Sequence, residues 1–185
     1  ILARISLDKP VYKEKLRLRA YGTPTDSSPV FLEIKKKYDG VVYKRRVSTD
    51  FAQAMRFLTE GIPPESGDYV ARQVTAEMTH MIRRDGLIPR AAVFYDRRAF
   101  HGADDPELRL TLDGNIRYRL GDLDLRNGTD GDTIPGQPFR IMEIKSASSI
   151  PLWLAGTLSE LGIHPGSFSK YGSVYKQRFQ DLCTT

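Results

Sequence analysis

Basic side chains recur at every second position in several short segments of this sequence. Lys15, Arg17 and Arg19 alternate with Leu16 and Leu18, which is the period of a strand that buries one face. The same period links Glu33 with Lys35, Lys44 with Arg46, Tyr95 with Arg97, Arg109 with Thr111 and Asp113, and Glu143 with Lys145. Arginine and lysine bind phosphate oxygens, arginine through a planar fork that makes two parallel hydrogen bonds. The pattern therefore predicts strands that present a phosphate-binding face.

These charged faces have two interpretations. For any single strand, the simpler one is a charged face turned to water. Repetition in every strand argues against it, because like charges on neighbouring strands repel each other, by about 4 kcal/mol at ~4 Å near a protein surface. A multivalent anion would compensate them. If helices cover the leucine faces, the cationic faces point inward and line a closed or nearly closed barrel.

Three carboxylates, Glu33, Asp113 and Glu143, fall on the same faces as the cations. A carboxylate among phosphate-binding cations suits Mg²⁺ or Mn²⁺, because these metals prefer hard oxygen ligands. The alternative for each carboxylate is an ion pair with a neighbouring cation. We expect the ion pair for Glu33 and the metal for Glu143, where an ion pair with Lys145 is the competing interpretation.

Near the C-terminus, Ser169 is placed to cap a terminal helix. Such a cap would bring Lys170 and free backbone N–H groups to the position where an anion binds. Taken alone, this segment indicates only a capped helix with a solvated lysine.

The net charge of the 185 residues is +5, but it is unevenly distributed. Residues 13–46 include ten basic and four acidic side chains, whereas the rest of the chain is close to balance. This local excess indicates a polyanion site rather than general surface basicity. The only cysteine, Cys183, excludes an internal disulfide framework and fits a reducing, cytoplasmic location. The longest apolar stretch, 150–156, is too short to cross a bilayer.

Other chemistries find little support in the sequence. The histidines at positions 80, 101 and 164 lack partners at metal-ligand spacing. No glycine-rich phosphate loop or dinucleotide fingerprint is present. Nucleic acid is the least favoured polyanion, because its sites combine cations with exposed aromatic rings and the tyrosines here are as easily explained by packing.

The elements that must position these residues follow from periodicity and turn signals. A hairpin turn is predicted at Asp39-Gly40, and a second at Asp113-Gly114-Asn115. Ser48 and Thr49 are the expected N-caps of a helix that ends at Gly61. Strands are predicted at 15–21, 31–35, 41–47, 90–100, 108–113, 116–120 and 139–145, helices at about 49–60, 68–84, 151–161 and from 168 onward, and a loop at 121–137. The fold class is α+β, with one domain over residues 1–185 dominated by an antiparallel sheet.

Seven segments occur in an order that resembles a known family. They are Lys-Leu-Arg-Leu-Arg-Ala-Tyr-Gly (15–22), Phe-Leu-Glu-Ile-Lys-Lys-Lys (31–37), Tyr-Lys-Arg-Arg-Val (43–47), Tyr-Asp-Arg-Arg-Ala-Phe (95–100), Leu-Arg-Leu-Thr-Leu-Asp (108–113), Ile-Met-Glu-Ile-Lys (141–145) and Phe-Ser-Lys-Tyr (168–171). Together they closely resemble the VTC (vacuolar transporter chaperone) domain, the polyphosphate polymerase module of yeast and many bacteria. The resemblance extends from about residue 5 to residue 175.

The resemblance implies a fold and an activity. The family belongs to the triphosphate tunnel metalloenzymes, which are CYTH-like, so it implies an eight-stranded antiparallel β-barrel tunnel with flanking helices. The implied reaction transfers the terminal phosphate of ATP to inorganic polyphosphate, with Mn²⁺ or Mg²⁺ bound. The family's first strand, which carries one phosphate-binding lysine, does not precede Ile1, so we expect an N-terminally incomplete domain.

The resemblance also assigns residues. It implies phosphate contacts for Arg17, Arg19, Lys35, Lys44, Arg97, Arg109, Lys145 and Lys170, assisted by Tyr95, and a metal on Glu143. Lys15 and Arg46, which share strand faces with these residues, complete the predicted phosphate-binding set. Catalysis is expected to depend on Arg17, Arg19, Lys35, Arg97, Arg109 and Lys170. Two alternatives stay open, a tunnel hydrolase of triphosphate or polyphosphate and a non-catalytic polyphosphate-binding regulatory module, as does any membrane-protein partner.

Overall fold

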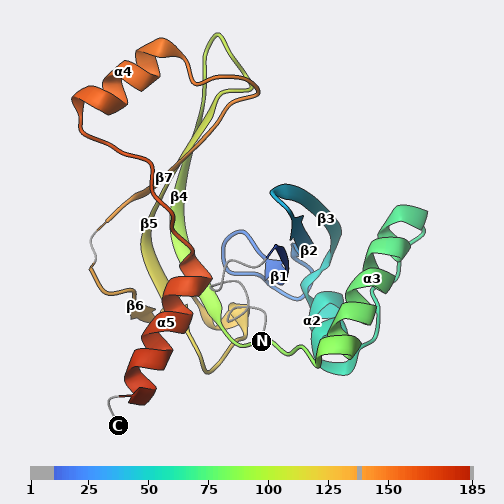
Figure 1. Ribbon diagram of the computed structural model, residues 1–185. Helices are drawn as coiled ribbons and strands as arrows, with labels where there is room; N and C mark the ends of the chain where they lie inside the picture. The colour runs from blue at the N-terminus through green and yellow to red at the C-terminus, as the bar shows by residue number, and fades with distance from the viewer. Residues whose placement is uncertain (1–10, 137–138, 184–185) are drawn as a thin grey trace. The chain divides into compact units, whose positions relative to one another are not determined.

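The computed structural model describes residues 11–136 and 139–183 (Figure 1). Its contacts form two compact units: residues 1–92 with 119–129, and residues 93–118 with 130–185. Each unit is described by itself. Both contain antiparallel strands and helices, which confirms the α+β class.

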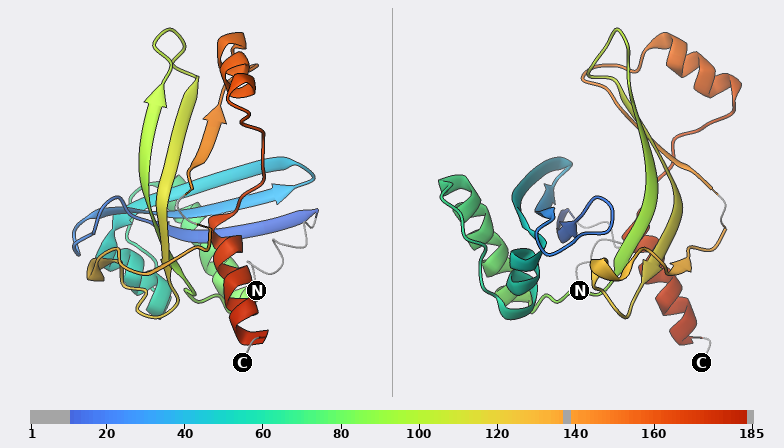
Figure 2. Two further views of the ribbon diagram at one scale, coloured as in Figure 1. Left: turned by 90° about the vertical axis from the view of Figure 1, so that its left-hand side faces the viewer. Right: turned by 180° about the vertical axis from the view of Figure 1, so that it is seen from behind.

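The first unit is built on an antiparallel three-stranded sheet in the order β1-β2-β3 (Figure 2). Its strands are β1 (Tyr12–Arg19), β2 (Pro29–Tyr38) and β3 (Val41–Asp50). The predicted turn between β2 and β3 is confirmed: Asp39 and Gly40 have φ angles of 43° and 83°, the left-handed conformation that a tight hairpin requires.

Two helices cover one face of this sheet, α2 (Phe51–Glu60) and α3 (Tyr69–Asp85). The N-cap of α2 is Asp50, whose side chain accepts a hydrogen bond from the backbone N–H of Gln53, so the prediction of Ser48 or Thr49 was wrong. Strand β3 continues through both of those residues, which leaves the first carboxylate after them to cap the helix. Gly61 and Gly86 end the helices in the left-handed conformation, as expected.

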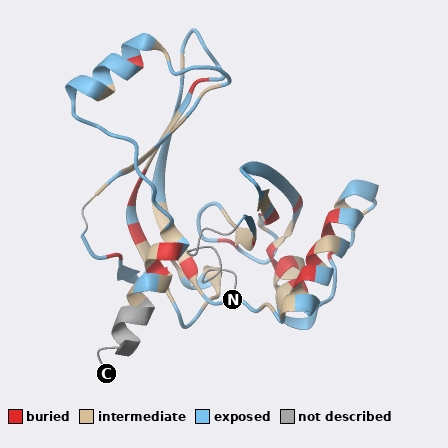
Figure 3. Ribbon diagram, in the orientation of Figure 1, coloured by how far each residue is buried: buried red, intermediate tan, exposed pale blue. Residues whose placement is uncertain are grey.

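The apolar residues of the strands pack beneath these helices. Leu32 and Ile34 of β2 are almost completely buried, as are Phe51, Phe57 and Met78 of the helices (Figure 3). Alternation along β2 therefore turns Glu33 and Lys35 to the opposite face. The prediction that helices cover the leucine faces is confirmed for this unit. Residues 119–129 add a short 3-10 helix, η1 (Leu125–Asn127), and Leu125 packs against this core.

The second unit contains a four-stranded sheet in which β5 (Arg109–Arg119) has neighbours on both sides. On one side lies β4 (Ala92–His101); on the other, β7 (Ile141–Lys145) pairs with the first half of β5 and β6 (Asp132–Thr133) with the second. The turn from β4 to β5 closes with a hydrogen bond from the Gly102 N–H to the Leu108 carbonyl. A Cβ on Gly102 would lie 2.6 Å from the carbonyl oxygen of Asp105, so this turn requires glycine.

The hairpin predicted at Asp113-Gly114-Asn115 is wrong, because β5 runs through these residues as one strand. They mark the point where the partner of β5 changes from β7 to β6. Asn115 adopts a φ of 50°, and the missing side chain of Gly114 makes room for Arg140, whose Cδ would lie 2.8 Å from a Cβ there. Residues that are typical of turns thus produce an irregularity in the strand pairing of β5 rather than a reversal of the chain.

Two helices complete the second unit, α4 (Leu152–Glu160) and α5 (Lys170–Cys183). The helix predicted at 151–161 is present, but Pro151 is its N-cap rather than its first helical residue; α4 is largely exposed, with Leu154 as its buried residue (Figure 3). None of the helices in the described part of the chain is long and apolar enough to cross a membrane.

The predicted eight-stranded closed barrel is not found. Among residues 11–136 and 139–183, the strands form sheets of three and four strands, and neither sheet closes on itself.

Candidate phosphate-binding sites

The first unit presents a cationic face on the side of its sheet opposite the helices. Residues directly opposite one another share a face, and the register places Lys15, Lys35 and Lys44 in one row across the three strands. The next row is formed by Arg17, Glu33 and Arg46. We call this side the cationic face; its charged residues are Lys13, Lys15, Arg17, Arg19, Glu33, Lys35, Lys37, Lys44 and Arg46.

All the site residues predicted in this unit therefore lie on one face. The predicted exception on β3 is also confirmed: Arg45 points to the other side, where its Nη2 lies 2.5 Å from Glu77 of α3. Strand parity separated the cations that contact the helices from those that do not.

Glu33 is the carboxylate at the centre of the cationic face, and its side chain is only 2% exposed. Its Oε2 lies 2.5 Å from Arg17 Nε and 3.8 Å from Arg19 Nε, and its Oε1 lies 3.3 Å from Lys44 Nζ. Burial alone would raise the pKa of Glu33, but the hydrogen bond from Arg17 and the three positive charges hold it below the ordinary value. Glu33 thus forms the ion pair that the sequence favoured, and it fixes the positions of three predicted site residues.

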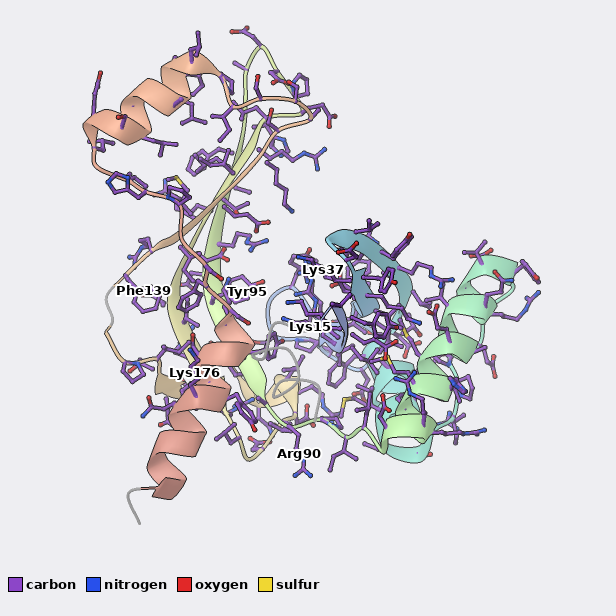
Figure 4. The ribbon with its side chains drawn as sticks, in the orientation of Figure 1. Lys15, Lys37, Arg90, Tyr95, Phe139 and Lys176 are labelled. Atoms are coloured by element: carbon purple, nitrogen blue, oxygen red, sulfur yellow. The ribbon has the colours of Figure 1, made fainter. Side chains whose placement is uncertain are left out.

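Lys15 and Lys35 have no such partner. Among the described residues no carboxylate pairs with either, although the two lie directly opposite each other on β1 and β2 (Figure 4 labels Lys15). Burial, together with the charges of Lys13, Lys35 and Arg17, lowers the pKa of Lys15. Two lysine charges this close, with no described carboxylate between them, favour binding of a multivalent anion, because the anion would relieve the repulsion between the lysines.

The second unit holds a compact cluster around Asp113, whose side chain is 3% exposed. Arg97 of β4 contacts it with both nitrogens of its fork, Nε to Oδ1 at 2.6 Å and Nη2 to Oδ2 at 2.8 Å. Lys170, the first residue of α5, donates to Oδ2 at 2.6 Å. The ring of Tyr95, which Figure 4 labels, lies beneath both cations, with its centroid 4.5 Å from Lys170 Nζ. Three predicted site residues, Tyr95, Arg97 and Lys170, therefore meet at Asp113.

The position of Lys170 depends on the start of α5. The Ser169 hydroxyl accepts a hydrogen bond from the backbone N–H of Gly172 at 3.2 Å, which confirms the predicted cap. Although burial alone would raise the pKa of Asp113, the hydrogen bonds from Arg97 and Lys170 keep it below its ordinary value. Asp113 is therefore ionised in the folded protein at neutral pH.

The remaining predicted residues lie farther along the same strands. Register places Arg109 opposite Lys145 and Thr111 opposite Glu143. Glu143 is half-exposed and its Oε1 lies 3.2 Å from Lys145 Nζ, so the ion pair that competed with the metal interpretation is present. Arg109 is exposed and forms no ion pair with any described residue.

The residues around Glu143 also suit a hard metal ion. The Thr111 hydroxyl is buried and makes no hydrogen bond to any described residue, and it lies across the ladder from Glu143. Mg²⁺ binds proteins through one or two oxygen ligands and takes the rest from phosphates and water. No group of three histidine, cysteine or acidic side chains that could hold a metal ion occurs in the described parts of the chain. The residues present therefore fit a metal that substrate phosphates hold in place, not one enclosed by protein.

Comparison with known families decides the assignment. The model of the VTC domain matches residues 3–179, nearly the whole chain. The chain belongs to the VTC domain family. That family is associated with polyphosphate metabolism. A search of curated proteins found no match.

Two residues of this VTC domain contribute more than sequence reasoning assigned to them. For Asp113 a metal ion and an ion pair were both left open, and the structure shows the ion pair, with Arg97 and Lys170 as its partners. Thr111 was interpreted only as part of an alternating pattern, although its buried hydroxyl makes no hydrogen bond to the residues that the structure describes. The alternation of residue types in the sequence showed which face of the strand these two side chains share. It did not show that they are buried, because burial depends on which segments pack over each strand.

Proposed function

We propose that this VTC domain is a metal-dependent polyphosphate polymerase that transfers the terminal phosphate of ATP to a growing polyphosphate chain. The observation that supports this most directly is the pair of Lys15 and Lys35, which no carboxylate among the described residues offsets and which is bordered by cations that Glu33 already holds in position. Such a face suits a linear polyanion with many identical phosphates.

The reaction requires no nucleophile from the protein. A terminal oxygen of the polyphosphate chain attacks the γ-phosphorus of ATP, a new P–O bond forms, and the bond from that phosphorus to the β–γ bridging oxygen breaks. ADP leaves with the electron pair of the broken bond. Catalysis then consists of positioning the two phosphates and neutralising the charge on the transferring oxygens.

The protein's own residues divide this work. Arg17, Arg19 and Lys44 are held by Glu33 and offer their remaining N–H donors to phosphate oxygens. Lys15 and Lys35 supply charge that no described carboxylate offsets. In the second unit, Arg97 and Lys170 are held by Asp113, and Arg109 presents a guanidinium that pairs with no described carboxylate. Glu143 and Thr111 would hold Mg²⁺ or Mn²⁺, which when bound polarises phosphate oxygens.

The test is product analysis with the full chain. ATP and Mn²⁺ are incubated with the protein, and the products are resolved on a gel. Long phosphate chains support the polymerase. Orthophosphate without chains indicates the hydrolase, and binding without turnover indicates the regulatory module; either result overturns the proposal.

A matched pair of variants ties the activity to the cationic face. Lys35→Met removes one charge from this face, whereas Arg56→Met removes one charge from α2, where Arg56 is exposed and has only a 3.9 Å contact with Glu60. Both variants have the same net charge. Chain synthesis should fall at least tenfold in Lys35→Met and stay near wild type in Arg56→Met.

A further inference from the structure

The cationic face ends in a pair of aromatic rings that phosphate binding does not explain. The rings of Tyr21 and Phe31 meet edge to face, with centroids 6.1 Å apart. The guanidinium of Arg46 lies over the Phe31 ring, 4.9 Å from its centroid, and Arg19 Nη1 lies 3.4 Å from the Tyr21 hydroxyl. We call Tyr21, Phe31 and these two arginines the aromatic corner.

The aromatic corner does not belong to the hydrophobic core. Register places Phe31 between Arg19 and Ser48, on the cationic face, whereas its neighbours Val30 and Leu32 are completely buried beneath the helices. Tyr21 is 71% exposed. Neither ring is among the residues packed in the core cluster. Two large rings beside arginines, accessible to solvent, form a surface on which a flat ring can stack.

We propose that the aromatic corner binds the nucleobase of the nucleoside triphosphate whose phosphates lie on the cationic face. This inference rests on the proposed function and identifies which part of the donor lies where. An inorganic phosphate chain has no group that gains from aromatic stacking, whereas a nucleobase stacks on aromatic rings and on arginine.

The spacing of the rows agrees with this assignment. Phe31 and Lys35 are four residues apart on β2, which corresponds to about 13 Å along a strand. That distance is on the scale of an extended nucleoside triphosphate. The base at Phe31 would place the inner phosphates near Arg17 and Arg46, and the terminal phosphate near the row of Lys15, Lys35 and Lys44.

The test compares two ligands that differ in the nucleoside. Binding of ATP and of inorganic tripolyphosphate to the full chain is measured by calorimetry for wild type, Tyr21→Ala and Tyr21→Phe. Loss of one stacking ring should weaken ATP binding about tenfold. Tripolyphosphate binding should stay within twofold in the same variant. Tyr21→Phe keeps the ring and should bind ATP like the wild type.

Tyr38→Ala is the matched control, because Tyr38 is 60% exposed and lies on the other face of the same sheet. It should change neither affinity. Equal weakening of both ligands in Tyr21→Ala, or no weakening of ATP, would overturn the assignment of the aromatic corner while leaving the proposed function intact. A wild-type protein that binds neither ligand would overturn both.

Discussion

Replacing Asp113 with asparagine tests whether this carboxylate compensates the cations of the second unit. The substitution keeps the size and one acceptor oxygen but removes the charge that accepts two hydrogen bonds from Arg97 and one from Lys170. Breaking a buried ion pair by removing one partner costs about 3 to 5 kcal/mol. The side chains of Arg97 and Lys170 are 32% and 19% exposed, so water replaces part of what they lose. We therefore expect the free energy of unfolding to fall by about 2 to 3 kcal/mol.

Urea denaturation followed by circular dichroism measures this loss, with Asp96→Asn as the control. Asp96 is on β4, its side chain is 64% exposed, and its nearest cation, Arg117, is 3.9 Å away. Its replacement should cost about 0.5 kcal/mol or less from the ion pair. Because the pKa of Asp113 is lowered in the folded state, its contribution is present above about pH 4 and is lost as the pH falls through the folded-state value. The difference between wild type and Asp113→Asn should shrink accordingly.

Phosphate should replace the missing carboxylate. At a concentration one hundred times its dissociation constant, a ligand that binds only the folded state adds about 2.7 kcal/mol, close to the expected loss. Tripolyphosphate should therefore stabilise Asp113→Asn at least as much as it stabilises the wild type. If the variant is folded but binds tripolyphosphate more than tenfold more weakly, the reasoning fails, because Asp113 would then be needed for positioning rather than for compensation.

Three further substitutions probe other parts of the two units. Arg109→Ala should weaken tripolyphosphate binding by about 1.5 to 3 kcal/mol with little change in stability, since Arg109 has no described ion pair; equal dissociation constants in a titration would contradict this. Glu143→Gln should abolish Mn²⁺-dependent turnover and leave polyphosphate binding within twofold, so full activity would exclude the metal assignment. Lys15→Met should raise the free energy of unfolding at pH 7, because the lowered pKa of Lys15 means that its charged form destabilises the folded wild type. This difference between variant and wild type should diminish as the pH rises toward 10.5, since the wild type gains stability when Lys15 loses its proton. Urea titrations that give the same difference at pH 7 and pH 10 would be inconsistent with the lowered pKa.

The alternation of residue types predicted the first unit well. Leu32 and Ile34 carry enough apolar surface to fix which face of β2 the helices cover, and that choice places Glu33 and Lys35 on the other face, whereas Lys36 lies on the helix side and pairs with Glu77 of α3. Arg45 was separated from Arg46 by the same argument. The two-residue alternation along the strands thus predicted both which residues form the core and which form the cationic face.

The second unit was predicted less well because its sequence signals are local and its structure is not. Asp113-Gly114-Asn115 has the composition of a hairpin turn, yet β5 continues because it gains β7 as a partner before this point and β6 after it. Both partners come from later in the chain, so no short window of sequence contains the competing interaction. Tertiary pairing overrode a correct local preference.

The three carboxylates on the charged faces show what parity leaves undetermined. Glu33, Asp113 and Glu143 occupy equivalent positions in their alternating patterns, but Glu33 and Asp113 are buried whereas Glu143 is half-exposed. A buried carboxylate must be paired, so the first two hold several cations each. An exposed carboxylate keeps its ion pair at little energetic advantage and can exchange it for a metal ion. Burial is therefore the reason why the metal is proposed for Glu143 and not for the other two carboxylates.

The pairing of cations is uneven in a way that fits the proposed transfer of phosphate. Arg17, Arg19 and Lys44 are anchored by Glu33, and anchored donors lose little side-chain entropy when they bind a phosphate. No carboxylate in the described part of the chain pairs with Lys15 or Lys35, and these two lysines supply the long-range attraction. If every cation were paired with a carboxylate, the face would bind phosphate weakly. If none were paired, the cations would repel one another and their side chains would not be held in fixed positions. The combination provides attraction and fixed geometry together, which a reaction that depends on alignment of two phosphates requires.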